Sequence, residues 1–505
     1  MRKMLRVALV VLTSVTVFSL SSFAQEPQYG GTLKVVTPSI PAVLGYFKEM
    51  GPVDLAAAYP AAEPLMEYSS RRELKPFLAE SVDINQNNLT MTFHLRKGIK
   101  FHDGSDFNAD AVAYNFTWLK DVKRLQFGDK VKSIEVLDPY TVRLYLTEYN
   151  NQLIHGLGWV FMWSKQALST KSPDWLRANP VGTGPFKLAE WRRDDHAKWE
   201  RNKDYWQKGR PYLDGIEVRY VPDPVTASEM MQTKQADMWT NPPVKDQADL
   251  EKKGFVRNFG YSGRIQTIFL NTTDPNRPTG KVKVREAIEY AIDKAAMAKA
   301  LGFGYASPLK LTAPEGEWGY DPNYKGRTYD PQKAKQLLAE AGYPNGLKLK
   351  LMIMQDNRDA ATAIKSYMDQ AGFDVDIDVA DPGRFFGSLW GTGFDDMLLF
   401  FSGLDPTYLV TFQRWFGDDP LTKIASFKAS PELLALSKES ITYTKEADQK
   451  AVTKKLVRML ADEADIVPLY SITAAYMARP YVHSVYLKEG LVQWRTFDDW
   501  LEKNR

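Results

Sequence analysis

A succession of helices and strands between residues 282 and 401 constrains the fold more than any other feature of the sequence. "DPQKAKQLLAEAG" and "RDAATAIKSYMDQAG" have helical patterns, and "LKLKLMIM" and "DVDIDV" have strand patterns. Asp330 is a predicted N-cap, Pro331 a first helical residue, and Gly342 and Gly372 predicted helix stops. Strand–helix–strand order with short loops predicts an α/β unit on a mainly parallel sheet.

The part of the chain before residue 282 follows a different pattern. "LTMTFHL" places Met91 and Phe93 on one face and His94 on the other, which predicts a half-exposed strand. Asn108 is a predicted cap for the helix in "ADAVAYNFTWLKDV". "KSIEVLDPYTVRLYL" predicts a hairpin that turns at Asp138. "VREAIEYAIDKAAMAKAL", at the start of the second pattern, has apolar residues at helical spacing and predicts a helix.

The length and charge of the chain limit what it can be. At 505 residues it exceeds a single hydrophobic core, which predicts two to four domains. Lys and Arg number 65 and Asp and Glu number 62, and three of the basic residues lie in the first 24 positions. The remaining chain is therefore neutral, so nothing in its charge requires nucleic acid or an anionic membrane as a partner.

The first 24 residues have the pattern of a secretory signal. A basic start precedes an apolar run over residues 7–20, and Ser22 and Ala24 have the spacing of a cleavage site. We expect the mature chain to begin at Gln25. An uncleaved anchor is the alternative, but the apolar run is shorter than the roughly 20 residues that span a bilayer.

The chain contains no cysteine. This excludes a lipid-modified N-terminal cysteine, iron–sulfur clusters, thiolate zinc sites and cysteine nucleophiles. An exported protein without a lipid anchor is predicted to be periplasmic.

Residues typical of catalysis are scattered. "FHLRKGIKFHDGSDF" contains His94 and His102, but no two of the five histidines have a metal-ligand spacing. The chain has no G-x-S-x-G elbow and no Walker A motif. Asp395 and Asp396 in "FDDM" are predicted to be a solvated pair at a strand start. We therefore expect no catalytic residue, no metal and no cofactor, and a carboxylate-based hydrolase remains a remote alternative.

Four segments in this order resemble a known family. They are "LAESVDINQNNLTMTFHLRKGIKFHDGSDFNADAV", "NPVGTGPFKLAEW", "ERNKDYWQKGRPYLDGIEVRYVPDPVTASEMMQTKQADM" and "FLNTTDP" followed by "VKVREAIEYAIDKAAM". The chain resembles the family 5 extracellular solute-binding proteins of bacterial ABC importers, the oligopeptide, dipeptide and nickel-binding group. The first segment holds His94 and His102, and the resemblance implies that both are structural.

The resemblance implies an α/β, three-domain periplasmic binding protein-like II fold whose two lobes close on a ligand cleft. The implied hinge lies near Asn271–Thr279 and Ala478–Tyr481. The implied parts are a signal peptide at 1–24, a ligand-binding domain I at 25–67, 181–277 and 477–505, a family-specific domain II at 68–180, and a ligand-binding domain III at 278–476.

The resemblance also implies a function. The protein would be a monomer that captures a peptide or peptide-like solute in the periplasm and delivers it to the transmembrane subunits of an ABC permease. An oligosaccharide or another organic solute is the main alternative. A nickel or haem-type ligand is less favoured, because the histidines are scattered and cysteine is absent. By this implication the protein is not an enzyme.

The segment "FDDMLLFFSGLDPTYL" departs from the peptide-binding relatives. These usually carry Trp-x-x-Asp and then Asp-Pro, whereas here Phe401 stands where the Trp would be. Either the acid is missing or Asp405 takes its role. Because ligand sites gather at the carboxyl ends of strands, we predict Trp390, Phe401, Ser402 and Asp405 as substrate-binding residues. The alternative is that the two aromatic residues are core and Asp405 caps a turn.

Overall fold

The computed structural model describes residues 26–69, 73–125, 128–403, 405, 407–417, 423–485 and 494–503, without the side chains of 259–263, 402, 403 and 474. The predicted signal peptide and its cleavage at Gln25 lie outside the described residues. Within the described ranges, no helix is both long and apolar enough to span a bilayer.

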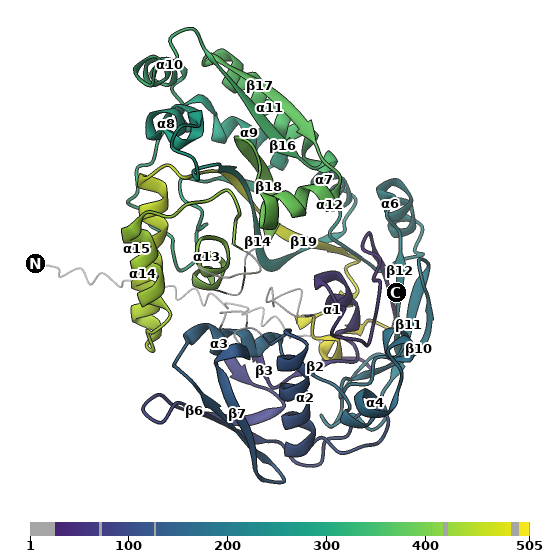
Figure 1. The fold of residues 1–505 in the computed structure, drawn as a ribbon. Coiled ribbons are helices and arrows are strands. Elements are labelled where there is room, and N and C mark those ends of the chain that lie inside the picture. The colour runs from purple at the N-terminus through teal and green to yellow at the C-terminus, as the bar shows by residue number, and fades with distance from the viewer. Residues whose placement is uncertain are drawn as a thin grey trace, which may run out of the picture.

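One large mixed sheet runs through the molecule (Figure 1). Its described strands, in spatial order, are β10 (Phe186–Arg192), β11 (His196–Arg201), β12 (Gly215–Tyr220), β1 (Thr32–Thr37), β13 (Met238–Thr240), β19 (Ile466–Ala478), β14 (Val256–Leu270), β18 (Met397–Gly403), β16 (Leu347–Ile353) and β17 (Phe373–Val379), and β15 (Ala306–Pro308) pairs with β19. Strands β16, β17 and β18 pair in parallel, as predicted, but β14 and β19 are antiparallel to their neighbours.

Strands β14 and β19 join two parts of this sheet. We call strands β10, β11, β12, β1 and β13 the right-hand region. Strands β16–β18 with helices α8–α15 are the upper region (Figure 1). The end of β19 near Met477 is buried in one core with Trp239 of β13. Its beginning near Val467 is buried in another core with Ile268 of β14. Strand β19 is therefore held by apolar packing at both ends, and β14 at its C-terminal end.

The upper region has an apolar layer on each face of its sheet. One layer packs against α8 (Val282–Ala291), α9 (Lys294–Gly302), α10 (Pro331–Glu340) and α11 (Arg358–Gln370). The other packs against α12 (Pro382–Gly387), α13 (Tyr408–Phe416), α14 (Pro431–Ser440) and α15 (Glu446–Asp462). The side chain of Asp330 caps α10 through the amide of Lys333, and Gly342 and Gly372 have positive φ after their helices, as predicted.

The helix predicted from "VREAIEYAIDKAAMAKAL" is in fact two helices. Helix α8 ends at Ala291, and Ile292 is extended. Asp293 then accepts a hydrogen bond from the amide of Ala296 and starts α9. An aspartate that competes for a backbone amide can end one helix and begin the next without interrupting the apolar spacing.

A second, four-stranded sheet forms what we call the lower region (Figure 1). Strands β5 (Ala79–Asn85), β6 (Thr90–Leu95), β8 (Thr141–Leu146) and β7 (Val131–Asp138) are antiparallel. The hairpin at Asp138 is confirmed. The alternation predicted for β6 is confirmed in part, because Met91 and Phe93 are buried and His94 is less so, but Thr92 on the predicted exposed face is buried as well. Asn108 caps α2 (Ala109–Asp121), as predicted, and this helix covers the sheet.

The remaining described elements are short. The helices are α1 (Pro52–Ala58), α3 (Asn151–Gly156), α4 (Lys165–Thr170), α5 (Pro173–Ala178), α6 (Pro224–Gln232) and α7 (Val244–Lys252), and the strands are β2 (Glu63–Pro64), β3 (Met66–Tyr68), β4 (Leu74–Pro76), β9 (Phe161–Met162), β20 (Val482–His483) and β21 (Trp500–Leu501).

Candidate functional site

The candidate site lies where β14, β18 and β19 leave the upper region. Arg264 on β14 pairs with residue 403 of β18 and with Ile472 of β19. The Arg264 guanidinium lies 5.5 Å from the ring centre of Phe401, one of the predicted site residues. Tyr476, four residues after Ile472 on β19, falls on the same face by strand alternation. The three side chains thus line one stretch of the sheet surface.

Arg264 combines exposure with partial desolvation. Its side chain is solvent-exposed, yet the surrounding protein lowers its pKa, an effect that Tyr476 and Asp356 partly oppose. A cation at the bottom of a water-filled cleft has both properties, since water reaches it from one side only. Among the described side chains, no carboxylate forms an ion pair with Arg264. Its guanidinium can therefore receive an anionic group of a solute.

Asp405 lies near the lower region but has partners of its own. Its Oδ1 accepts a hydrogen bond from Arg414 at 2.6 Å, and its Oδ2 accepts one from the Thr411 hydroxyl at 3.1 Å. Burial, and secondly the charge of Asp405, raise the pKa of Tyr68 on β3. The carboxylate therefore faces the lower region, with both oxygens already engaged.

The other two predicted residues are placed differently. The Trp390 ring packs on Phe400, with ring centres 6.3 Å apart. Because side chains alternate along β18, Phe400 and Phe401 point to opposite faces of the sheet. Trp390 therefore lies on the face opposite to Phe401 and Arg264. Residue 402 of β18 pairs with Ile265 of β14, and the side chain of residue 402 lies outside the described residues.

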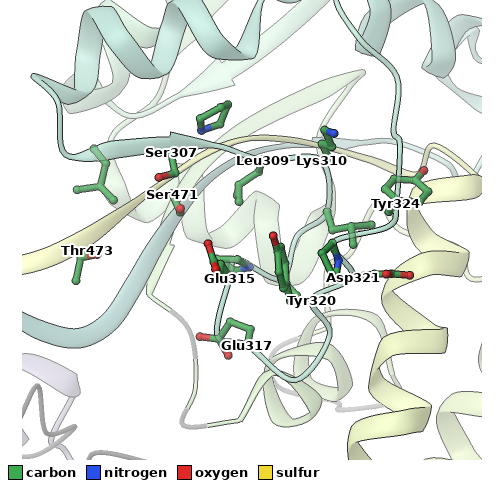
Figure 2. Close-up of a pocket in the computed structure, with 16 residues that line it drawn as sticks. Ser307, Leu309, Lys310, Glu315, Glu317, Tyr320, Asp321, Tyr324, Ser471 and Thr473 are labelled. Atoms are coloured by element: carbon green, nitrogen blue, oxygen red, sulfur yellow. The ribbon is translucent and has the colours of Figure 1, made fainter.

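A cavity of about 370 Å³ lies beside β15 and β19 (Figure 2). Ser307 and Ser471, which pair directly across these strands, form its upper wall. Ser471 also pairs with Ile265, so the cavity lies one strand from the predicted residue 402. Its volume is at the lower end of the range for small-molecule pockets, which begins at about 300 Å³.

The lower wall of the cavity is acidic. Figure 2 shows Glu315, Glu317 and Tyr320 below the strands, with Lys310 at the upper side. Glu317 is buried, with only 7% of its surface exposed. Asp321 also lines the cavity, but its carboxylate is 3.2 Å from Lys454 and 3.1 Å from Arg458.

The histidines of the "FHLRKGIKFHDGSDF" stretch have structural contacts. His94 lies diagonally across the β5–β6 pair from Asp83, with Nε2 at 3.0 Å from a carboxylate oxygen. His102 Nε2 lies 2.9 Å from the Gly184 carbonyl, and burial lowers the pKa of His102 to about 4, so its ring is neutral. In the part of the chain that the structure describes, no three His, Asp or Glu side chains are grouped as a metal site. Asp395 precedes β18 and pairs with Lys350 at 3.2 Å.

Sequence reasoning missed Arg264 and Tyr476. Arg264 stands in "YSGRIQTIFLN", where it is one polar residue at the beginning of an apolar strand. Tyr476 lies more than two hundred residues further along the chain. It is also close to Tyr59, which follows α1, since burial and secondly Tyr476 raise the pKa of Tyr59. No local pattern links these three positions. The antiparallel pairing of β14 and β19 brings the first two together.

Known proteins resemble the chain in sequence and in structure. Heme-binding protein A of Haemophilus influenzae is 33% identical over 308 residues, 56% of each chain. The glutathione-binding protein GsiB of Escherichia coli is 35% identical over 333 residues, 64% of each chain. Both alignments therefore span less than two thirds of the length of these relatives. The periplasmic binding protein DppA from Helicobacter pylori, solved with the peptide STSA, superposes with a TM-score of 0.78 at 25% identity and covers 94% of this chain and 99% of that one.

The superposition on DppA agrees with the predicted fold class, a mixed α/β periplasmic binding protein fold. The sequence profile of the bacterial extracellular solute-binding proteins, family 5, matches residues 73–430, which is well over half of the chain. The chain belongs to the bacterial extracellular solute-binding proteins of family 5.

Proposed function

We propose that this protein binds a small peptide or peptide-like solute between its upper and right-hand regions and delivers it to the transmembrane subunits of an ABC importer. The observation that carries the proposal is Arg264, an exposed guanidinium in the candidate site with no ion pair among the described side chains. A planar guanidinium matches the two oxygens of a carboxylate, which every unmodified peptide has at its C-terminus.

The names of the relatives support a solute of this class. GsiB is a glutathione-binding protein, and DppA was solved with a tetrapeptide. Heme-binding protein A is named for haem, which also carries carboxylates. An oligosaccharide or another organic solute is the alternative outcome. The protein has the role of a binding protein and not of an enzyme in this proposal.

The proposal includes the domain division implied by the sequence. Domain I comprises 25–67, 181–277 and 477–505, domain II 68–180 and domain III 278–476. The composition of the cores supports the main separation, since one cluster joins Leu33, Ile216 and Leu501 of domain I, whereas another is built mainly from domain III residues such as Ile288, Leu349 and Val467. The connecting strands β14 and β19 would flex as the cleft closes on a solute.

The proposal also includes export and assembly. The mature chain starts at Gln25, is released into the periplasm without a lipid anchor and acts as a monomer. N-terminal sequencing of the exported protein tests this. A retained Met1, or release by detergent only, would contradict it.

The decisive experiment is mass spectrometry of small molecules that co-purify with the mature protein. We expect a compound with a carboxylate, returned intact after incubation, and a smaller radius of gyration in solution scattering once the protein is saturated with it. A neutral sugar would select the alternative. Conversion of the compound to product would show an enzyme, and an unchanged radius at saturation would argue against closure.

A further inference from the structure

The lower and upper regions also touch at the side of the molecule away from β10–β12 (Figure 1). Helix α3, which packs on the lower region through Leu153, lies beside the lower ends of α14 and α15. Asn151, the first residue of α3, makes three hydrogen bonds across this boundary. Its amide donates to the Ile441 carbonyl at 2.9 Å, and its side-chain Nδ2 donates to the carbonyls of Ser440 at 2.8 Å and Tyr443 at 3.0 Å.

These carbonyls are at the end of α14, where a helix lacks its own donors. Helix α14 ends at Ser440, with Ile441 as its C-cap. The last carbonyls of a helix need partners from outside the helix. The first amides of a helix have the same need, and Asn151 supplies one of them from α3. Each helix end thus satisfies unpaired groups of the other, and Asn151 is fully buried as a result.

A second contact lies one turn further along α3. His155 Nε2 is 3.1 Å from Gln449 Oε1 on α15. The Gln449 amide group donates to the Tyr443 carbonyl at 2.9 Å, so its oxygen is turned towards His155 and accepts from the ring. Burial lowers the pKa of His155, which keeps the ring neutral and Nε2 able to donate.

Among the described residues, the apolar cores of the two regions are separate at this boundary. Leu153 and Leu157 belong to the core of the lower region. Leu433 and Val452 of α14 and α15 belong to a core of the upper region. The boundary is therefore held mainly by polar groups that water can replace when the regions separate, beside one ring contact between His155 and Trp318 with ring centres 5.9 Å apart.

We propose that Asn151 and His155, together with Ser440, Ile441, Tyr443 and Gln449, form a latch that holds the upper and lower regions together at this boundary. The proposal rests on the proposed function for the opening motion. None of the hydrogen bonds described above for the latch residues reaches Arg264 or Phe401. They set how readily the protein stays closed, and thereby how tightly it retains any solute.

The absence of cysteine allows a direct test without a solute. Asn87 in the lower region and Lys455 on α15 are exposed. Spin labels on the N87C/K455C chain report the distance between the two regions by pulsed electron resonance. We compare this parent with N151D, which places a carboxylate against the helix carbonyls at nearly unchanged size, and with N151A as a second variant.

The matched control is N179D. Asn179 Nδ2 also donates to a backbone carbonyl, that of Trp175 at 2.7 Å, but within one region. We expect the ratio of short to long distances to fall by about tenfold in N151D, because two hydrogen bonds are lost and a buried charge is added. The ratio should fall by less in N151A, and in N179D it should equal that of the parent. Circular dichroism and urea midpoints confirm folding.

Unchanged distances in both folded Asn151 variants would overturn the latch. A shift of the same size in N179D would overturn it as well, since the effect would not depend on the boundary. Because the measurement needs no solute, a latch that responds as expected while no co-purifying solute is found would count against the proposed function alone.

Discussion

On one side of the molecule, β14 and β19 carry the backbone between the upper and right-hand regions, whereas on the other side α3 meets the end of α14 through hydrogen bonds between separate parts of the chain. At the first junction, both strands end in apolar cores, with Ile268 and Met477 fully buried. At the second, the contacts are those of Asn151 and His155.

The difference indicates which junction can open. Separating two apolar surfaces costs about 25 cal/mol for each Å² that water regains, so the strand junction persists in any motion of a folded protein. Exchanging hydrogen bonds between helix ends for hydrogen bonds to water costs only about 0.5–1.5 kcal/mol each. A protein that must admit and release a solute needs one junction of each kind.

The largest effect should follow from weakening the strand junction. Ile268→Ala removes a fully buried side chain from β14 and should lower the free energy of unfolding by about 2–5 kcal/mol. Urea denaturation measures it. Val256→Ala, at the 41% exposed start of the same strand, is the matched control and should change stability by less than about 0.5 kcal/mol. Equal losses would show that the apolar core is not what holds this junction.

A polar contact buried within the protein provides the next comparison. Glu63 accepts hydrogen bonds from Tyr205 at 2.6 Å, Trp206 at 2.9 Å and Thr183 at 2.8 Å. Burial nevertheless raises the pKa of Glu63 from 4.5 to about 7. The folded protein therefore holds this proton more tightly than the unfolded chain, and the resulting stability is present below pH 4.5 and lost as the pH rises through 7.

Glu63→Gln cannot titrate, so its stability relative to the wild type should rise by roughly 3 kcal/mol between pH 4 and pH 8. Urea denaturation at several pH values tests this. The control is Glu190→Gln, because hydrogen bonds from Lys198 and His196 lower the pKa of Glu190 to about 2. Its difference from the wild type should stay constant between pH 5 and pH 8. A difference for Glu63→Gln that does not depend on pH would be incompatible with a buried, protonated Glu63.

Arg264 tests the side of the cleft next to the strand junction. For a co-purifying solute with a carboxylate, Arg264→Gln should weaken binding by roughly 30-fold or more, about 2 kcal/mol. Titration calorimetry measures it. Arg264→Lys keeps the charge without the planar fork and should lose less. Unchanged affinity in a folded Arg264→Gln protein would place the anionic anchor elsewhere.

The smallest effect is expected at Asp405. Because Arg414 and Thr411 already occupy its oxygens, Asp405→Asn should lower stability by about 1 kcal/mol and solute affinity by less than about tenfold. Calorimetry and urea denaturation of the same variant separate the two effects. A loss of affinity above about 30-fold would instead support the predicted anchor for a positively charged end of the solute.

Much of the local structure could be predicted from the sequence. Asn108 and Asp330 cap the expected helices, and the hairpin turns at Asp138 as expected. These features depend on residues within a few positions of one another. The break between α8 and α9 was missed, because the apolar spacing continues through Asp293 and conceals its capping role. The predicted site residues remain predictions, although the structure places Phe401 beside Arg264.

The sequence by itself determined many of the helices, strands and caps, the family and the pattern of a secretory signal, because each is encoded in neighbouring residues or in ordered motifs. Only the tertiary structure decided that Arg264 lies on the same face as Phe401 and that Asn151 reaches Ser440, 289 positions along the chain. Such pairs follow from strand register and from the packing of separate cores, and these depend on burial summed over the whole molecule. An arginine at a strand start and an asparagine at a helix start look the same in sequence whether or not a partner lies opposite.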